Sequence, residues 1–182
     1  MEKKDLKLAG VFKYFEEICQ VPRPSKKEEK MIAYLKAFGA KHNLETKVDE
    51  AGNVLIKKPA TPGKENLQTV VLQSHIDMVC EKNNDVQHDF LTDPIETEID
   101  GEWLKAKGTT LGADNGIGVA TELAILADDS IEHGPLECLF TVDEETGLTG
   151  AFELKEGFMS GDILLNLDSE DEGEIFIGCA GG

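Results

Sequence analysis

The chain has 182 residues, enough for one domain with a substantial apolar core and too few for two. Its 36 acidic residues outnumber its 18 basic residues and give a formal net charge of −18, which argues against nucleic acids and anionic membranes as partners. The cysteines are scattered without a CxxC pair, so neither a zinc finger nor a disulfide framework is indicated. The sequence shows no signal-peptide core and no apolar run approaching about 18 residues, so we expect a cytoplasmic protein.

Local periodicity predicts alternating helices and strands. Apolar residues at helical spacing predict helices over residues 8–19, from Ser25 to between Gly39 and Asn43, after Asp114 to about Ala127, and over 149–154. Apolar runs predict strands over residues 44–50, 53–58, 67–73, 136–142, 163–167 and 174–178, with a separate hairpin over 95–107. The spacing of Ser25 and Glu28 is that of a capping box.

Three of these strands, LQTVVLQ, LECLFTV and ILLNL, are short and mainly apolar, which suits buried strands of a parallel or mixed sheet. The sequence therefore predicts an α/β fold with a mixed, mostly parallel central sheet flanked by helices. No internal repeat or low-complexity tract is present.

A glycine-rich turn, GTTLGADNGIGVA over residues 108–120, presents Asp114 at the start of a helix. One interpretation is an ordinary helix cap, a role for which aspartate is common. A phosphate-binding loop is disfavoured because no Lys-Ser/Thr pair follows and Thr121 replaces the third glycine of a dinucleotide motif. A carboxylate at this point would repel phosphate and attract a metal ion.

Metal-ligand residue types follow each of the three apolar strands. His75 and Asp77 follow the first, Glu144 and Glu145 the second, and Asp168 the third. Since the carboxyl ends of parallel strands lie at one edge of a sheet, these residues are expected to meet there, together with the Asp114 turn. Each residue alone has an ordinary explanation as a solvated or turn residue, but the combination predicts a metal site.

Imidazole nitrogen with carboxylate oxygens indicates zinc, or cobalt or manganese. Asp114 could bridge two ions about 3.5–4 Å apart. Asp77, two residues after His75, is placed to accept the other N–H of the imidazole, unless it is a plain turn aspartate.

At these residues the sequence resembles the dinuclear zinc peptidases of the aminoacylase/carboxypeptidase type. The stretches VPRPSKKEE, SHIDMVCEKN, GTTLGADNGIGVA, TVDEETGLTGA and LLNLDSEDEGEIFIGCAGG are most similar to aminoacyl-histidine dipeptidases, the bacterial carnosine dipeptidases. The likeness runs along essentially the whole chain in the expected order.

This resemblance implies a role for each matching residue. His75 and Asp168 would hold one zinc and Glu145 the other, with Asp114 bridging both ions. Glu144 would be the general base and Asp77 would orient His75. The resemblance also implies a cis peptide bond after Asp114.

The implied function is metal-dependent hydrolysis of dipeptides, such as β-alanyl-histidine, by a zinc-activated water. Family enzymes are longer, so residues 1–182 correspond to the N-terminal part of a catalytic domain. A lid and dimerisation domain and the C-terminal catalytic half, which supplies a further zinc-ligating histidine, would be absent. We expect the chain alone to be inactive and the full-length protein to form a homodimer through the missing domain.

Three alternatives remain open from the sequence. An N-acyl amino acid deacylase of the same superfamily would carry the same metal-site residues. A calcium-binding loop over residues 168–179 matches an EF-hand loosely through Asp168, Glu170, Glu172 and Gly173, but Cys179 stands where the bidentate glutamate is required. A non-catalytic metal-binding or interaction fragment is the third.

Overall fold

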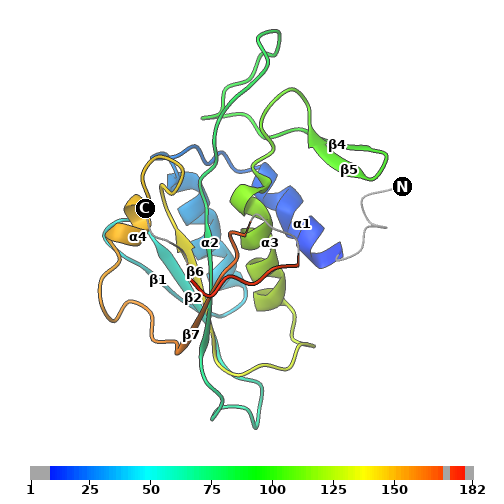
Figure 1. Cartoon of the computed structure of the whole chain (residues 1–182). Coiled ribbons are helices and arrows are strands. Elements are labelled where there is room, and N and C mark those ends of the chain that lie inside the picture. The colour runs from blue at the N-terminus through cyan, green and yellow to red at the C-terminus, as the bar shows by residue number, and fades with distance from the viewer. Residues whose placement is uncertain (1–8, 170–172, 179–182) are drawn as a thin grey trace.

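A central sheet with helices packed against one face forms the body of the protein (Figure 1). The computed structural model describes residues 9–169 and 173–178. The elements in chain order are α1 (Ala9–Cys19), α2 (Glu29–Lys41), β1 (Glu45–Val48), β2 (Val54–Lys58), β3 (Val70–His75), β4 (Thr97–Asp100), β5 (Trp103–Ala106), α3 (Ala113–Ala127), β6 (Leu136–Thr141), α4 (Thr149–Phe152) and β7 (Ile163–Asn166).

The five-stranded sheet has the order β1-β2-β6-β3-β7. Strand β3 runs parallel to β6 on one side and to β7 on the other, whereas β1, β2 and β6 are joined by antiparallel pairing. The carboxyl ends of β6, β3 and β7 therefore lie at one edge. This confirms the predicted mixed α/β sheet, and the predicted hairpin forms separately as β4 and β5.

The two faces of the sheet are covered very differently. On one face, alternate strand residues such as Val54, Leu72 and Phe140 join the side chains of α1, α2 and α3 in the main core. On the other face, Leu55, Val71 and Leu139 form only a small cluster, and it is partly covered by side chains from residues 154–159.

Helix α3 lies beside α1 and against β3, and its first turn is irregular. Gly112 is its N-cap, with a left-handed φ of 68°, and the backbone of Asp114 and Asn115 departs from helical angles. The peptide bond between Asp114 and Asn115 is cis, as the resemblance implied. Among the described residues, no helix combines the length and the apolar character needed to cross a membrane.

The predicted capping box does not form. Glu28 is the N-cap of α2, and no side-chain hydrogen bond caps that helix. The Ser25 hydroxyl instead donates to Asp77 Oδ2 (2.7 Å), and Glu28 Oε1 accepts the backbone N–H groups of Lys26 and Asp143. The prediction was wrong because Ser25 donates to a distant segment and Glu28 is itself the residue at which the helix begins.

Two predictions for the C-terminal strands also need correction. Strand β7 forms where expected but is not buried, since all four of its residues are exposed at the edge of the sheet. No strand forms at residues 174–178, because residues 173–178 have no regular secondary structure.

Candidate metal centre

The site is built at the edge where three parallel strands end. His75 is the last residue of β3, while Glu144 and Glu145 follow β6 and Asp168 follows β7. Asp114 lies in the first turn of α3, which packs against β3. The structure thus brings together every residue that the sequence predicted for the site.

His75 is at the centre of this group. Its side chain is 1% exposed, and its Nε2 atom lies 3.1 Å from Asp114 Oδ1, 3.8 Å from Asp168 Oδ2 and 3.9 Å from Glu144 Oε2. Its Nδ1 atom lies 3.3 Å from Asp77 Oδ1 on the other side of the ring. The imidazole therefore has one nitrogen toward the acidic cluster and the other toward a single buried carboxylate.

The helix-cap interpretation of Asp114 is not supported. Gly112 occupies the N-cap position, and no side chain forms a capping hydrogen bond there. The Asp114 side chain is 73% exposed and contacts His75 instead. Its carboxylate is therefore free to take part in the cluster.

Asp77 is fully buried and contacts the backbone and side chains of several residues of the acidic cluster. In addition to the contact with His75, Asp77 accepts the backbone N–H groups of Glu144 (3.0 Å) and Glu145 (3.2 Å) and the hydroxyl of Ser25. Burial alone would raise the pKa of Asp77, but His75 and these donors outweigh it and lower the pKa to about 2. Asp77 therefore links the β3 end to the glutamate pair as an ionised group.

The remaining carboxylates crowd one another. Burial raises the pKa of both Glu144 and Glu145; His75 opposes this, and neighbouring carboxylates add to the increase. Burial also raises the pKa of Asp168. The charge of Asp114 adds to this increase, and a hydrogen bond with Asn115 opposes it. The cluster therefore favours an added positive charge.

The donor set fits a divalent metal ion. Ligand atoms of His75, Asp114 and Glu145 lie within 4.8 Å of one another, as do those of His75, Glu144 and Asp168. Burial opposes a charge on His75, but Asp77 and Asp114 raise its pKa to about 9, so a metal ion would take the place of a bound proton. His75 belongs to both groups, so these distances do not by themselves divide the residues between two ions.

The other histidines lie in unrelated surroundings. The His42 ring lies tilted against Phe38, and the His88 ring meets Phe90 edge to face. His133 Nδ1 lies 2.7 Å from the carbonyl oxygen of Gly134. Within the described residues, none of the three belongs to a group that could hold a metal.

The calcium-loop alternative is not supported, because Asp168 follows a strand and an EF-hand loop requires a helix there. Glu170, Glu172 and Cys179 lie outside the described residues.

Asp77 was predicted from the sequence, but Glu28 and Asp143, two buried carboxylates that lie beside it, were missed. Glu28, Asp77 and Asp143 form a second buried carboxylate group. Its oxygens accept donors from the chain itself; for example, Thr146 and Thr149 donate to Asp143, so no metal is needed there. The signal in the sequence was the polar segment after Pro24, which the spacing of a capping box concealed.

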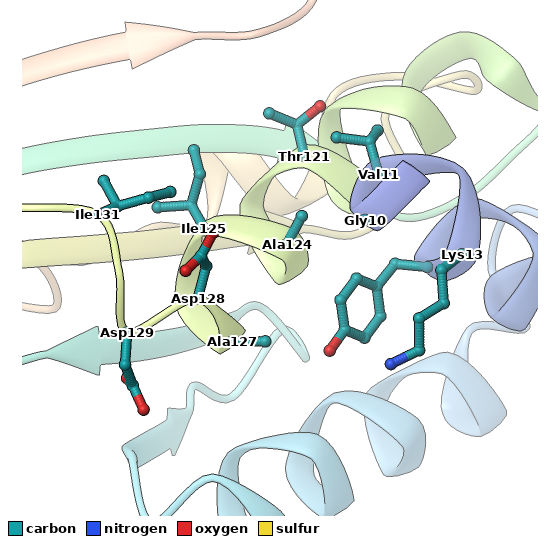
Figure 2. A pocket seen from close by; sticks show the side chains of 11 residues that line it. Gly10, Val11, Lys13, Thr121, Ala124, Ile125, Ala127, Asp128, Asp129 and Ile131 are labelled. Carbon is teal, nitrogen blue, oxygen red and sulfur yellow. The ribbon is translucent and has the colours of Figure 1, made fainter. Parts of the chain in front are cut away.

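An apolar groove of about 620 Å³ lies elsewhere, between α1 and the C-terminal half of α3 (Figure 2). Val11, Ala124, Ile125 and Ile131 contribute apolar side chains to it. It shares no residue with the acidic cluster and lies toward the opposite end of α3 from Asp114. The groove is therefore not the cleft of the candidate metal centre.

Comparison with known proteins agrees with this geometry. The chain is 55% identical over 168 residues to the cytosol non-specific dipeptidase of Escherichia coli, covering 92% of this chain and 35% of that protein. It matches the crystal structure of aminoacylhistidine dipeptidase from Vibrio alginolyticus with a TM-score of 0.95 and 55% identity, covering 98% of this chain and 36% of that one. Aminopeptidase PepT from Bacillus cereus matches with a TM-score of 0.77 and 25% identity, over 91% of this chain and 44% of that chain.

The chain thus spans about a third of the length of the two relatives that are 55% identical to it. The profile of peptidase family M20/M25/M40 matches residues 71–179, which include all the residues of the acidic cluster. With the predicted ligand types gathered at the carboxyl edge of the sheet, the chain belongs to peptidase family M20/M25/M40.

Proposed function

We propose that this chain is the N-terminal part of the catalytic domain of a metal-dependent dipeptidase. The observation that carries the proposal is the convergence of His75, Asp114 and Glu145 with Glu144 and Asp168 at one edge of the sheet. Relatives that are 55% identical are named as dipeptidases, which supports peptide substrates over the N-acyl amino acids of the deacylase alternative.

The proposed cofactor is a pair of zinc ions, with cobalt or manganese as possible replacements. His75 and Asp168 would hold one ion and Glu145 the other, and Asp114 would contribute to both. Such ions supply Lewis acidity, which makes a water more acidic and polarises the carbonyl of the scissile peptide bond.

Glu144 is the proposed general base. Its side chain is 30% exposed and its carboxylate lies 3.9 Å from His75 Nε2, so it borders the cluster and remains open to water and substrate. It would take a proton from the attacking water and then donate it to the leaving amine. The backbone bond from Glu144 to Asp77 would hold this carboxylate in position.

The open edge of the sheet supports a longer protein. Strand β7 is parallel to β3, yet all of its side chains are exposed. Parallel strands are normally covered on both faces, so further chain is expected to pack against β7. We assign this covering to a C-terminal catalytic half, and dimerisation to a lid domain, both lying outside residues 1–182.

The proposed substrates are dipeptides with C-terminal histidine, such as β-alanyl-histidine, and the proposed location is the cytosol. The names of the Vibrio and Escherichia coli relatives support these two assignments respectively. They also differ on breadth, since one is called non-specific and the other is named for aminoacyl-histidine.

A metal-replacement assay on the full-length protein tests the function. The protein is stripped with a chelator, reloaded with zinc, cobalt or manganese, and assayed with β-alanyl-histidine and with a dipeptide lacking histidine. We expect hydrolysis only after reloading and a higher kcat/KM for the histidine dipeptide. Full activity in the stripped protein would refute the metal mechanism, and equal kcat/KM values would refute the histidine preference alone.

A further inference from the structure

Arg23 lies between the two segments that carry His75 and Asp114. It follows α1 in the chain, and its side chain is only 2% exposed. One guanidinium nitrogen, Nη1, donates to the carbonyl oxygens of Ile76 (3.1 Å) and Asp77 (3.2 Å). The other, Nη2, donates to the carbonyl oxygen of Gly112 (2.5 Å).

These carbonyl groups are next to the proposed ligands in sequence. Ile76 directly follows His75, and Gly112 precedes Asp114 by two residues. A long excursion that includes β4 and β5 separates the two segments along the chain. The guanidinium therefore links the segment after His75 directly to the segment before Asp114, although the two are far apart in the sequence.

The backbone of Arg23 is fixed to the same strand end. The N–H group of Met78 donates to the Arg23 carbonyl oxygen (3.2 Å), and Pro24 and Met78 form a parallel bridge. The main chain of Arg23 is thus held beside the end of β3, while its side chain reaches Gly112 before α3.

Two glycines of the GADNG turn leave room for the guanidinium. A Cβ atom at Gly112 would lie 2.5 Å from Arg23 Nη2, and one at Gly116 would lie 2.8 Å from the same atom. Real Cβ atoms almost never come that close to another atom, so a side chain at either position would displace the guanidinium. The turn that presents Asp114 is therefore shaped around Arg23.

We propose that Arg23 is a positioning residue for the metal centre, because its guanidinium sets the separation of the His75 and Asp114 donors. This inference rests on the proposed function. A planar, forked guanidinium can donate to both segments at once, whereas a lysine ammonium is a single point donor on a flexible stem. The hydrogen bonds of Arg23 described above go to carbonyl groups of the backbone that carries the proposed ligands, so its proposed effect on them passes through that backbone.

The test measures Co²⁺ binding to the full-length protein and its R23K and R23M variants. Expected results are a Kd for Co²⁺ about 10–100-fold higher in both variants and an altered visible absorption spectrum of bound Co²⁺. K58M is the matched control. Lys58 is also a buried basic residue, and its Nζ donates to the carbonyl oxygens of Ile125 (3.1 Å) and Asp128 (2.8 Å) at the far end of α3. K58M should lower the melting temperature without changing the Kd or the spectrum.

If R23M does not fold, R23K and G116A test the proposal in its place. The methyl group that G116A adds should displace the Arg23 guanidinium and shift the Co²⁺ spectrum in the same direction as R23K does. An unchanged Kd and spectrum in the folded variants, with only a lower melting temperature as in K58M, would overturn the positioning role and leave the proposed function intact. A wild-type protein that neither binds Co²⁺ nor hydrolyses dipeptides would overturn both.

Discussion

Glu144 and Glu145 show how two identical neighbours come to occupy different places in one site. The ligand atoms of Glu144 group with those of His75 and Asp168, whereas those of Glu145 group with His75 and Asp114. Both backbone N–H groups are held by the buried carboxylate of Asp77. The fixed backbone lets each side chain approach the cluster from its own direction.

Replacing Glu144 by glutamine is expected to remove turnover while leaving metal bound. The amide cannot carry the proton, and a general base is worth roughly 10²–10⁴-fold in rate. The measurements are kcat and zinc content of the full-length protein, with E145Q as the control that should lose zinc. A fall in zinc content as large as the fall in activity would show that Glu144 is a ligand.

Asp77→Asn should weaken metal binding without abolishing it. The carboxylate of Asp77 accepts N–H groups from Glu144 and Glu145 and the hydroxyl of Ser25, and an amide would turn a donor toward one of them. The expected loss is about 10–100-fold in metal affinity, measured by titration. S25A, which removes a single donor, should cost less. An unchanged metal affinity in D77N would show that Asp77 is an ordinary turn residue without a role in metal binding.

Glu122 predicts a dependence of stability on pH. It lies fully buried on α3, with Ser74 and Cys138 beside its carboxyl group, and neither of its oxygens has a hydrogen-bond partner of good geometry. Burial raises the pKa of Glu122 well above its ordinary value of 4.5, with Ser74 and Cys138 opposing the shift. The folded chain therefore holds this proton to higher pH than the unfolded chain does.

The sign follows from that difference in proton binding. The contribution of Glu122 is fully present below pH 4.5 and is lost as the pH rises toward the folded-state pKa, by at most about 1.4 kcal/mol per pH unit. E122Q should remove this slope, so the gap in unfolding free energy between the wild type and E122Q should shift in favour of E122Q as pH rises. Urea denaturation across that range measures it, with the exposed Glu102→Gln as control. A gap that stays constant with pH would show that Glu122 does not titrate in this way.

At the scale of elements, β7 is the strand whose surroundings differ most from its sequence. Its run of Ile-Leu-Leu-Asn is apolar, but Leu164 is 46% exposed and Leu165 is 47% exposed. An uncovered parallel edge strand with apolar side chains is a site at which further chain can pair and pack. Among the described residues, neither apolar cluster includes a residue of β7, so no helix covers either face of this strand.

Leu164→Lys is expected to change the unfolding free energy of the full-length protein much more than that of residues 1–182 alone. In residues 1–182 the substitution is on an exposed surface, and the unfolding free energy should change by no more than about 0.5 kcal/mol. In the full-length protein the lysine would be buried without a partner, at a cost of about 3–5 kcal/mol. Chemical denaturation of both forms measures this, and the exposed loop substitution L67K should be mild in each. Equal small effects for L164K would show that nothing covers β7.

At the scale of the whole molecule, counting ligands predicts how residues 1–182 behave alone. A catalytic zinc usually has three protein ligands, and His75, Asp114 and Asp168 supply three for one ion. The second ion would have only two ligands, Asp114 and Glu145. Among the described residues, no other histidine lies in a group that could supply a third ligand. We expect isothermal titration to show at most one tight zinc and carnosine assays to show no hydrolysis. Two tight sites with turnover would refute the missing-ligand argument.

The sequence alone determined most of the elements and the composition of the site. Helical and strand periods are local, so α1, α3 and β6 form close to their predicted bounds. The site followed from a topological rule, because parallel strands end at the same edge, and His75, Glu145 and Asp168 each lie just beyond a strand end. Membership of a peptidase family was visible in the same residues.

Only the tertiary structure decided which buried polar groups support that site and which surfaces stay open. Ser25 was expected to cap its own helix but bonds to Asp77, 52 positions away, and Arg23 reaches Gly112 across 89 positions. Strand β7 was expected to be buried and is exposed. Periodicity reports which face of an element is apolar, whereas the partner of a polar side chain and the covering of a strand depend on how distant segments are packed together.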